Sequence, residues 1–458
     1  MASRGRIIFE KLRALAIVST GGFTTFSALN IYNENEKYYE NFIVPLMHKV
    51  SPETAHNLTI KALKYGLIPK SKFVDPPSLV TGVWNLTFHN PVGIAAGFDK
   101  QGDAIQGLFD IGFGIVEVGS VTPLPQPGNE KPRVFRLAVD EAIINRYGFN
   151  SEGHETVYKR ILEFKAKSKS RGCLGVNLGK NKTSESLISD YVLGVQKFGE
   201  VADYLVINVS SPNTPGLRNW QSKSNLKQLL QEVVTTRNNL AFLPRPPLLL
   251  KLSADLSYDE CKDIVDVIND PKCKVDGLII SNTSIQRPAT LNGDHVEETG
   301  GLSGKPIADM STSLIKTFYK LTKGKVPIVG VGGISSGQDA YEKIKAGASL
   351  VQIYSTLVYH GPPVVTKIKR ELDECLRRDG FKSVAEAVGK DARAFWTIIC
   401  CLSIYGTINL VLASWIVYQT DAISFVVDTR FLNWNTSFPS VTLCELRNEE
   451  KIIKASIE

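Results

Sequence analysis

The chain has 458 residues, of which 43% are hydrophobic and 22% charged, the balance of an ordinary globular protein long enough for one large α/β domain with extensions. Its formal charge of +7 comes from basic residues scattered along the chain rather than gathered in a stripe. Nucleic-acid binding is therefore not expected, whereas attraction to anionic lipid or to a phosphorylated ligand fits this balance. None of the seven cysteines belongs to a C-x-x-C pair or lies beside a histidine cluster, which argues against a disulfide framework and against a metal site.

Residues 1–33 have the features of a targeting segment followed by a membrane anchor. Four basic residues and one acidic residue precede the uncharged stretch Ala14–Asn33. A basic, serine-containing start is typical of a mitochondrial presequence, and about 20 apolar residues can just cross a bilayer. A secretory signal is the alternative, but no convincing small-residue cleavage site precedes the acidic run Glu34-Asn35-Glu36. We expect a mitochondrial address with an uncleaved anchor.

Residues 34–70 contain a predicted pair of amphipathic helices. Ser51-Pro52-Glu53 is typical of a helix start, with an N-cap hydroxyl, a proline at the first helical position and an acid in the first turn. Apolar residues recur at helical spacing as far as Gly66, and the apolar segment Phe42–Met47 precedes them. The pattern fits packing against the next domain and fits equally an interfacial module that enters the membrane.

Residues 71–392 contain eight short runs rich in Val, Ile or Leu, a pattern typical of strands buried on both faces. The runs are Val92–Ala96, Ile115–Gly119, Leu174–Leu178, Tyr204–Val209, Leu248–Leu252, Gly277–Ser281, Pro327–Val331 and Leu350–Tyr354. Eight strands with helices between them predict an α/β protein with a (β/α)₈ TIM barrel. A doubly wound sheet is the alternative, disfavoured by the count and by the lack of a G-x-G-x-x-G motif. The longest gap holds a predicted hairpin, Arg133–Leu137 with Ala142–Asn145.

The ends of these runs are nearly all polar or glycine. In chain order they are Ala95-Ala96-Gly97, Gly119-Ser120, Asn177, Asn208, Lys251, Ser281-Asn282, Gly332-Gly333 and Tyr354-Ser355. The active site of such a barrel lies at the C-terminal ends of the strands, so these residues predict a polar floor at one mouth. The segment Val331–Gly337 follows the seventh strand and offers backbone N–H groups to a phosphate.

Lys251 is a single cation in this floor, and three roles are open to it. It could form a Schiff base, which would make the protein an aldolase. It could stabilise negative charge on a reduced cofactor ring to which Asn177 and Asn208 donate hydrogen bonds. It could also form a structural salt bridge, although no Asp or Glu ends a neighbouring strand.

A second uncharged stretch, Ala394–Thr420, lies in a C-terminal tail of residues 393–458. It is longer and more apolar than the first, and Trp396 and Trp415 lie where interfacial anchors are found. We expect a transmembrane helix here.

Several motifs of the central region together resemble the dihydroorotate dehydrogenase family. They are Gly93–Lys100, Glu117–Thr122, Asn145–Asn150, Asn208–Gly216, Ser281–Thr283 and Gly300–Gly304, within a match from about residue 40 to 391. Motifs of this length in the right order are highly specific. Ser211, where the soluble class has cysteine, and the N-terminal anchor with its helical pair indicate the membrane-bound class.

The resemblance implies oxidation of dihydroorotate to orotate in pyrimidine (UMP) biosynthesis, with FMN as hydride acceptor and ubiquinone as final electron acceptor. The location would be the mitochondrial inner membrane, and no oligomer would be required. The FMN-binding residues would be Ala95, Ala96, Gly97, Ser120, Asn177, Asn208, Lys251, Ser281, Gly304, Gly333, Tyr354 and Ser355. Dihydroorotate would be held by Lys100, Asn145, Arg146, Tyr147, Gly148, Phe149, Asn208, Asn282 and Thr283.

The same resemblance assigns the catalytic base and a quinone tunnel. Ser211 would remove the proton next to the ring carbonyl while Lys251 stabilises the reduced flavin. The tunnel between the helical pair and the barrel would be lined by Leu46, Met47, His56, Phe98, Arg136 and Tyr354. His56 would be an ordinary polar-face residue on sequence alone, and Thr59 and Ala62 are smaller than such a lining leads us to expect.

The tail resembles a different family. Its apolar segment, Phe431–Trp434 and Phe438–Cys444 resemble the first membrane helix and following motif of degenerin/epithelial sodium channel subunits, but cover far less than a channel. With Arg4–Arg13 on the matrix side, Lys390 and Arg393 would lie on the wrong side for the positive-inside preference. We therefore favour a fused or mis-joined gene model over a working second membrane domain, such as a channel-like segment.

Overall fold

The computed structural model describes residues 2–168, 172–420, 423–426 and 442–445. It divides into two compact units, residues 1–392 and residues 393–458.

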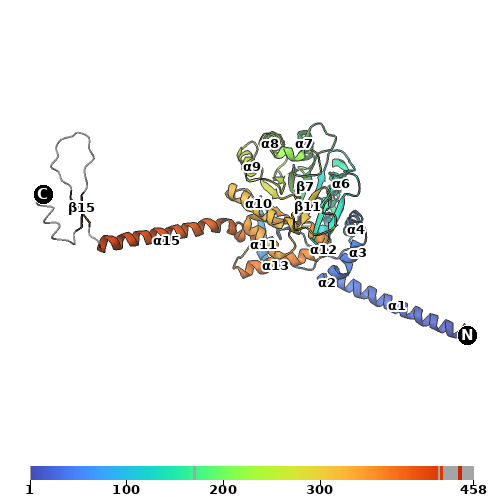
Figure 1. Cartoon of the computed structure of the whole chain (residues 1–458). Coiled ribbons are helices and arrows are strands. Elements are labelled where there is room, and N and C mark those ends of the chain that lie inside the picture. The colour runs from blue at the N-terminus through green and yellow to red at the C-terminus, as the bar shows by residue number, and fades with distance from the viewer. Residues whose placement is uncertain (1, 169–171, 421–422, 427–441, 446–458) are drawn as a thin grey trace. The chain divides into compact units, whose positions relative to one another are not determined.

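Eight parallel strands of the first unit close into a barrel, which confirms the predicted (β/α)₈ class (Figure 1). The strands are β3 Val92–Ile94, β4 Ile115–Val121, β7 Cys173–Leu178, β8 Tyr204–Asn208, β9 Leu248–Leu252, β10 Gly277–Ile280, β12 Ile328–Val331 and β13 Ala348–Ile353. Each predicted run overlaps one of them. The last strand pairs with the first, Ile353 beside Ile94, so every strand has two neighbours, unlike the edge strands of a doubly wound sheet.

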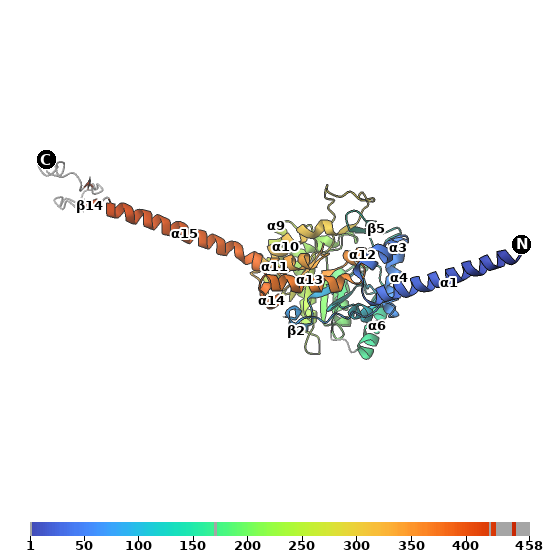
Figure 2. The same cartoon turned by 90° about the horizontal axis from the view of Figure 1, so that it is seen from below.

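Helices follow the strands and cover the outside of the barrel, as both views of the ribbon show (Figures 1 and 2). They are α5 Ile105–Asp110, α6 Gly153–Lys167, α7 Leu187–Phe198, α8 Lys223–Asn238, α9 Tyr258–Asn269, α10 Ala308–Leu321, α11 Gly337–Ala346 and α13 Val364–Arg378. Shorter helical segments are η2 Pro77–Leu79, η3 Leu217–Gln221, η4 Lys305–Ile307, α12 Ser355–His360 and α14 Val384–Ala387. Local sequence sets where several begin: Ser257 and Glu260 form a capping box that starts α9.

A small hairpin closes the N-terminal end of the barrel. It consists of β1 Thr81–Val83 and β2 Leu86–Phe88. Phe88 is buried in the apolar cluster that fills the lower barrel, and the Trp84 ring lies 6.0 Å from that of Tyr204. Because this end is filled by side chains, a ligand site is left to the opposite mouth.

A three-stranded antiparallel sheet lies in the loops of the C-terminal side. It contains β5 Val134–Leu137, β6 Ala142–Asn145 and β11 Gly301–Gly304, in the order β11-β6-β5. The predicted hairpin is confirmed as β5 and β6. The sequence did not predict β11, which reaches β6 through tertiary pairing of Gly301 with Asn145.

The N-terminal region begins with α1 Ala2–Tyr32, whose residues Arg6–Tyr32 are long and apolar enough to cross a membrane. It continues with α2 Glu36–Tyr38, the π-helix η1 Tyr39–Ile43, α3 Val44–His48 and α4 Pro52–Lys64. Ser51 caps α4 as predicted, by accepting a hydrogen bond from Thr54 N at 3.4 Å.

The helical pair packs on the barrel with one face and exposes apolar side chains on another. Leu63 is buried against α5, where the missing side chain of Gly107 admits the Leu63 backbone: a Cβ there would lie 2.4 Å from the Leu63 carbonyl oxygen. Phe42, Leu46 and Leu58 are exposed. The packing interpretation is therefore confirmed, and the exposed apolar residues are compatible with the interfacial one.

The second unit contains most of the helix α15 Lys390–Thr420, followed by the paired strands β14 Ile423–Val426 and β15 Thr442–Glu445. Residues Ile399–Ile416 of α15 are long and apolar enough to cross a membrane. Phe431–Trp434, and residues 438–441 of the second tail motif, lie outside the described residues.

Candidate active site

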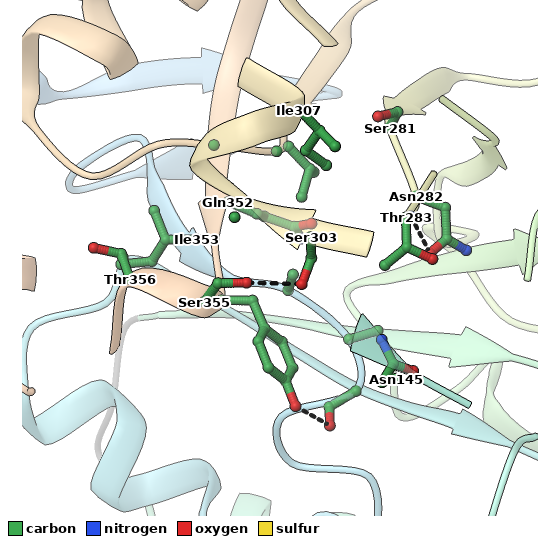
Figure 3. Close-up of a pocket in the computed structure, with 18 of the residues that line it drawn as sticks. Asn145, Ser281, Asn282, Thr283, Ser303, Ile307, Gln352, Ile353, Ser355 and Thr356 are labelled. Carbon is green, nitrogen blue, oxygen red and sulfur yellow. Dashed lines mark hydrogen bonds between the residues drawn. The ribbon is translucent and has the colours of Figure 1, made fainter. Parts of the chain in front are cut away.

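A pocket at the C-terminal mouth of the barrel collects nearly all the residues predicted for FMN and substrate. Its lining includes Ser211 and the following predicted residues: Ala95, Ala96, Gly97, Lys100, Ser120, Asn145, Tyr147, Gly148, Phe149, Asn208, Lys251, Ser281, Asn282, Thr283, Gly304, Gly333, Tyr354 and Ser355. Figure 3 shows Asn282 and Thr283 on one side, with Ser355 and Thr356 on the other. Two predicted residues, Asn177 and Arg146, lie outside this lining.

Asn177 lies one layer below the pocket and supports its floor. Its Oδ1 accepts hydrogen bonds from Ser120 Oγ and, at 3.1 Å, from Asn208 Nδ2. Asn208 Nδ2 also donates to Ser120 Oγ at 2.9 Å. These residues come from β4, β7 and β8, so closure of the barrel brings their polar groups together.

Of the three roles left open for Lys251, the salt bridge is present in the structure. Its Nζ lies 3.7 Å from Oε1 of Glu117, and both side chains are buried. Glu117 comes from the middle of β4, which is not adjacent to β9. A search restricted to the ends of neighbouring strands therefore missed it, because the pair forms across the barrel interior. Lys251 also lines the pocket, so the salt bridge and a role toward a ligand coexist.

The glycine turn after β12 is a narrower anion cradle than the sequence predicted. The carboxylate of Asp339 accepts the N–H groups of Ser335 and Ser336, each at 2.9 Å, and Glu371 accepts that of Gly337 at 2.7 Å. These three N–H groups are therefore bonded to carboxylates of the protein rather than offered to a phosphate. The upper part of the turn lines the pocket, and Gly333 has a φ of 72°, which favours glycine.

Three polar atoms of the pocket indicate that it is built for a polar ligand. Among the described residues, the buried Ser281 Oγ, Gln352 Oε1 and Thr356 Oγ1 have no hydrogen-bond partner. Buried polar atoms in folded proteins are almost always hydrogen-bonded, so these atoms fit contacts to a bound molecule. Nearby, the Ser303 and Ser355 hydroxyls lie 2.8 Å apart (Figure 3). Together with the glycine turn, this donor and acceptor set suits a flavin ring with a phosphate.

Lys100 supplies a cation beside the predicted substrate loop. Its Nζ lies 3.9 Å from the centre of the Tyr147 ring. Burial lowers the pKa of Lys100 to about 7, with Arg133 acting in the same direction and Glu53 opposing. The loop's other cation, Arg146, turns away and forms a 2.6 Å salt bridge with Glu298. Lys100 is therefore the cation that this region presents to the pocket.

Ser211 lies in the loop after β8 with its side chain buried at the pocket wall. Its Oγ accepts a hydrogen bond from the backbone N–H of Asn213 at 3.3 Å, a contact that stabilises negative charge on the oxygen. Arg218 holds this loop by donating to Ser210 O at 3.1 Å and to Thr283 O at 2.8 Å. Sequence reasoning missed Arg218, which follows no strand end directly.

A second, mostly apolar cavity lies between the helical pair and the barrel. Its lining includes the predicted residues Met47, His56, Phe98, Arg136 and Tyr354. Leu46 lies outside it, with 62% of its surface exposed. Thr59 and Ala62, whose small size put the tunnel in doubt, are both part of the wall.

The polar groups of this cavity are few compared with its apolar ones. Arg136 donates to the carbonyl oxygens of Met47 at 3.4 Å, His48 at 3.2 Å and Val50, and so ties α3 to the β5–β6 hairpin. The His56 ring lies edge-on to Phe98, with centroids 5.2 Å apart. Burial, and then the charge of Lys100, lower the pKa of His56 well below its ordinary value, so its ring is neutral at neutral pH.

The two cavities share part of their walls. Asn145, Tyr147 and Tyr354 line both of them. Tyr354 OH donates to Gly97 O at 3.2 Å, which fixes its ring between the barrel mouth and Phe98. A polar pocket and an apolar cavity are thus separated by single side chains.

Comparison with known proteins gives two matches along the chain. The family model described as dihydroorotate dehydrogenase matches residues 78–376, and that described as amiloride-sensitive sodium channel matches residues 377–456. Within the second match, Val384, Ala387 and Ala392 are buried in the core of the first unit. The structural boundary at residue 392 therefore lies later than the boundary between the two matches.

Similar proteins cover most of the first unit. The chain is 49% identical over 383 residues to the mouse protein named dihydroorotate dehydrogenase (quinone), mitochondrial, a match covering 82% of this chain and 96% of the mouse protein. It is 51% identical over 349 residues to dihydroorotate dehydrogenase (quinone) of Rhodospirillum rubrum, covering 76% of this chain and 94% of that one. The crystal structure of Eimeria tenella DHODH in complex with ferulenol superposes with a TM-score of 0.72 at 42% identity, covering 75% of this chain and 96% of that chain.

Proposed function

Because the chain belongs to the dihydroorotate dehydrogenase family, we propose that it oxidises dihydroorotate to orotate with FMN as hydride acceptor and ubiquinone as final electron acceptor. The reaction is the redox step of de novo pyrimidine biosynthesis, and we place it at the mitochondrial inner membrane. The observation that carries the proposal is the shared wall of Asn145, Tyr147 and Tyr354 between a polar pocket and an apolar cavity. An enzyme that takes electrons from a small anion and passes them to a lipid-soluble quinone needs two such adjoining sites.

The polar pocket suits dihydroorotate, a small ring with one carboxylate. Lys100 supplies the cation for the carboxylate, and Asn145, Asn282 and Thr283 supply polar groups for the ring. Arg146 acts from outside the pocket, since its salt bridge with Glu298 fixes the loop that carries Tyr147. The substrate is thereby held against the wall that contains Ser211.

Ser211 is the proposed base. Its Oγ takes the proton from the carbon next to the ring carbonyl while its own hydroxyl proton passes to a water molecule that reaches the pocket, and the N–H of Asn213 stabilises the negative charge that develops on Oγ during the transfer. The side chain is buried, so bulk water has limited access to this transfer.

The opposite side of the pocket is proposed to hold FMN, which supplies the hydride acceptor when it is bound. The strand-end residues Ala95–Gly97, Ser120 and Ser281 would hold its ring, and Gly333 and Ser355 would hold its phosphate. Lys251 places its cation in the floor, where it would stabilise negative charge on the cofactor ring.

The apolar cavity is proposed as the quinone site. In the proposed function the chain divides into four segments. Residues 1–33 address and anchor the protein, 34–70 form the quinone entrance, and 71–392 form the FMN-binding barrel. Residues 393–458 take no part, because every proposed site residue precedes them and the tail matches another family. The exposed Phe42 and Leu46 of the entrance fit contact with the bilayer.

An absorption spectrum of the purified protein tests the function. We expect a flavin band that bleaches when dihydroorotate is added without oxygen and returns when a ubiquinone is added. Lys251→Ala should lose or weaken flavin binding and activity together, because the cation in the floor is removed. A colourless protein that borohydride inactivates in the presence of a carbonyl substrate would contradict the proposal and support the Schiff-base alternative.

A further inference from the structure

Glu117 is a buried acid inside the barrel to which the proposed reaction gives no role. Its side chain is completely buried on β4, between the apolar lower layer and the pocket floor. An unpaired carboxylate is unfavourable in such a place, and an apolar side chain would fill the layer at lower cost. The carboxylate must therefore be stabilised by its neighbours, and those neighbours show what it can do.

Four strands send a polar group to this carboxylate. Oε1 accepts from Asn177 Nδ2 at 2.8 Å and lies 3.7 Å from Lys251 Nζ. Oε2 accepts from Gln352 Nε2 at 2.7 Å and from Tyr204 OH at 3.1 Å. Burial, and then the charge of Glu117, raise the pKa of Tyr204, so the phenol is a neutral donor.

A carboxylate accepts hydrogen bonds and cannot donate them, so it gives the neighbouring amide a direction. Asn177 must point its Nδ2 at Glu117, which turns its Oδ1 toward Asn208. Asn208 donates its Nδ2 to the Oδ1 of Asn177. The Oδ1 of Asn208 accepts from Asn282 Nδ2 at 3.3 Å. Asn282 Oδ1 in turn accepts from Thr283 N at 2.8 Å.

Glu117 thus sets the direction of Asn177, whereas backbone N–H groups orient the other two amides: Ser210 N donates to Asn208 Oδ1 at 3.3 Å, and Thr283 N to Asn282 Oδ1. Asn208 and Asn282 line the pocket, and Asn177 supports it from below. An amide can be reversed with little change in shape. Among the three, Asn177 is the amide whose Oδ1 accepts only from side chains in the described part of the chain, so its orientation depends on those neighbours. The carboxylate of Glu117, which can only accept, selects that orientation.

We propose that Glu117 is a positioning residue: its carboxylate fixes the orientation of the Asn177 amide, on which the hydrogen bond from Asn208 depends, and holds Lys251 in the pocket floor. It acts through these residues and does not touch the ligands. The inference rests on the proposed function, since it assigns the oriented groups to the flavin and the substrate.

Glu117→Gln tests the inference, because glutamine has the same shape but is neutral and can donate. Its amide can present N–H to Asn177, which permits Asn177 to reverse and so breaks the hydrogen bond that Asn177 Oδ1 accepts from Asn208 Nδ2. We expect the Kd of orotate for the oxidised flavoprotein, measured from the flavin absorption change, to rise about tenfold, the equivalent of roughly one hydrogen bond. The midpoint potential of the bound flavin should shift to more positive values, because a negative charge near Lys251 is lost.

Two further variants separate the orientation of the amide from the charge of the carboxylate and from the packing of the side chains around it. Glu117→Asp keeps the charge but withdraws the carboxylate by one methylene, so orotate binding should weaken while the midpoint potential stays closer to that of the wild type. Tyr204→Phe removes a neutral donor from the same carboxylate without touching the amide chain, and both measurements should stay at wild-type values.

Wild-type orotate affinity and midpoint potential in Glu117→Gln would overturn the inference, as would equal changes in Tyr204→Phe. If Glu117→Gln does not retain flavin, Glu117→Asp decides, and unchanged orotate affinity in that variant also overturns the inference. A wild-type protein without flavin, or one whose flavin dihydroorotate does not reduce, would instead overturn the proposed function.

Discussion

The pocket at the barrel mouth and the apolar cavity under the helical pair share a wall but are built differently. The pocket takes its polar groups from the ends of strands in one closed sheet, and hydrogen bonds across the barrel hold them, as between Asn177 and Asn208. The cavity takes much of its lining from α3 and α4, which are tied to the barrel at a few points such as Arg136. Groups that need a fixed direction thus lie on the most rigid element, whereas the entrance for an apolar molecule lies on a small peripheral module.

Ser211→Ala should break the pocket's chemistry and leave the cavity intact. Flavin reduction by dihydroorotate should slow by roughly 10²-fold or more, because the base is removed. Stopped-flow absorbance measures this step. Ser211→Cys is the matched variant, since a cysteine thiolate also accepts a proton, and it should retain more activity than alanine. Chemically reduced enzyme should still pass electrons to quinone at the wild-type rate, and an unaffected flavin reduction would show that Ser211 is not the base.

Deleting residues 1–68 should slow electron transfer to quinone and spare flavin reduction, the reverse of the effect expected for Ser211→Ala. It removes α3 and α4 but none of the proposed flavin contacts, so dihydroorotate should still reduce the flavin. Reoxidation by long-chain quinone should slow by about tenfold or more, because the cavity and the membrane proximity are lost. Deleting only residues 1–33 is the control, which keeps the cavity and should retain quinone kinetics in detergent. Normal quinone kinetics after the longer deletion would reject the cavity as the quinone site.

Substrate binding should depend on pH through Lys100, on the pocket side of the shared wall. With its pKa lowered to about 7, this lysine is charged below that pH and becomes neutral above it. The Kd of orotate should therefore rise between pH 6 and pH 8, by up to about tenfold as the charged fraction falls. Lys100→Met should bind orotate weakly with no such dependence. A wild-type Kd that is flat over this range would show that Lys100 does not pair with the carboxylate.

Truncation after Ala392 should change neither site. All proposed contacts precede this residue, so flavin content, orotate affinity and quinone reduction should be preserved. Solubility should improve, because the apolar segment Ile399–Ile416 promotes aggregation without a bilayer. Mass spectrometry of the native protein tests the tail itself. Peptides spanning Ala387–Phe395, or a full-length native chain, would contradict a mis-joined gene model, and a C-terminus near residue 392 would support it.

The sequence by itself predicted the strands and the mouth at which the pocket lies. Runs such as Leu248–Leu250 are apolar because both faces of a barrel strand are buried, and this pattern is local. The residues that end the strands are brought to one mouth because all eight strands are parallel. Asn208 and Lys251 could therefore be assigned to a common floor without knowledge of any contact between them. The family motifs then supplied roles that the pattern alone left open.

Tertiary structure alone decided which side chains meet across the barrel and which turn away. Glu117 lies inside an apolar strand pattern, and its pairing with Lys251 depends on closure between strands that are not adjacent. Arg146 and Leu46 lie in segments predicted to line the cavities, yet one pairs with Glu298 and the other faces outward. Periodicity determines the face on which a residue lies, but the partner it reaches depends on contacts between segments far apart in the chain.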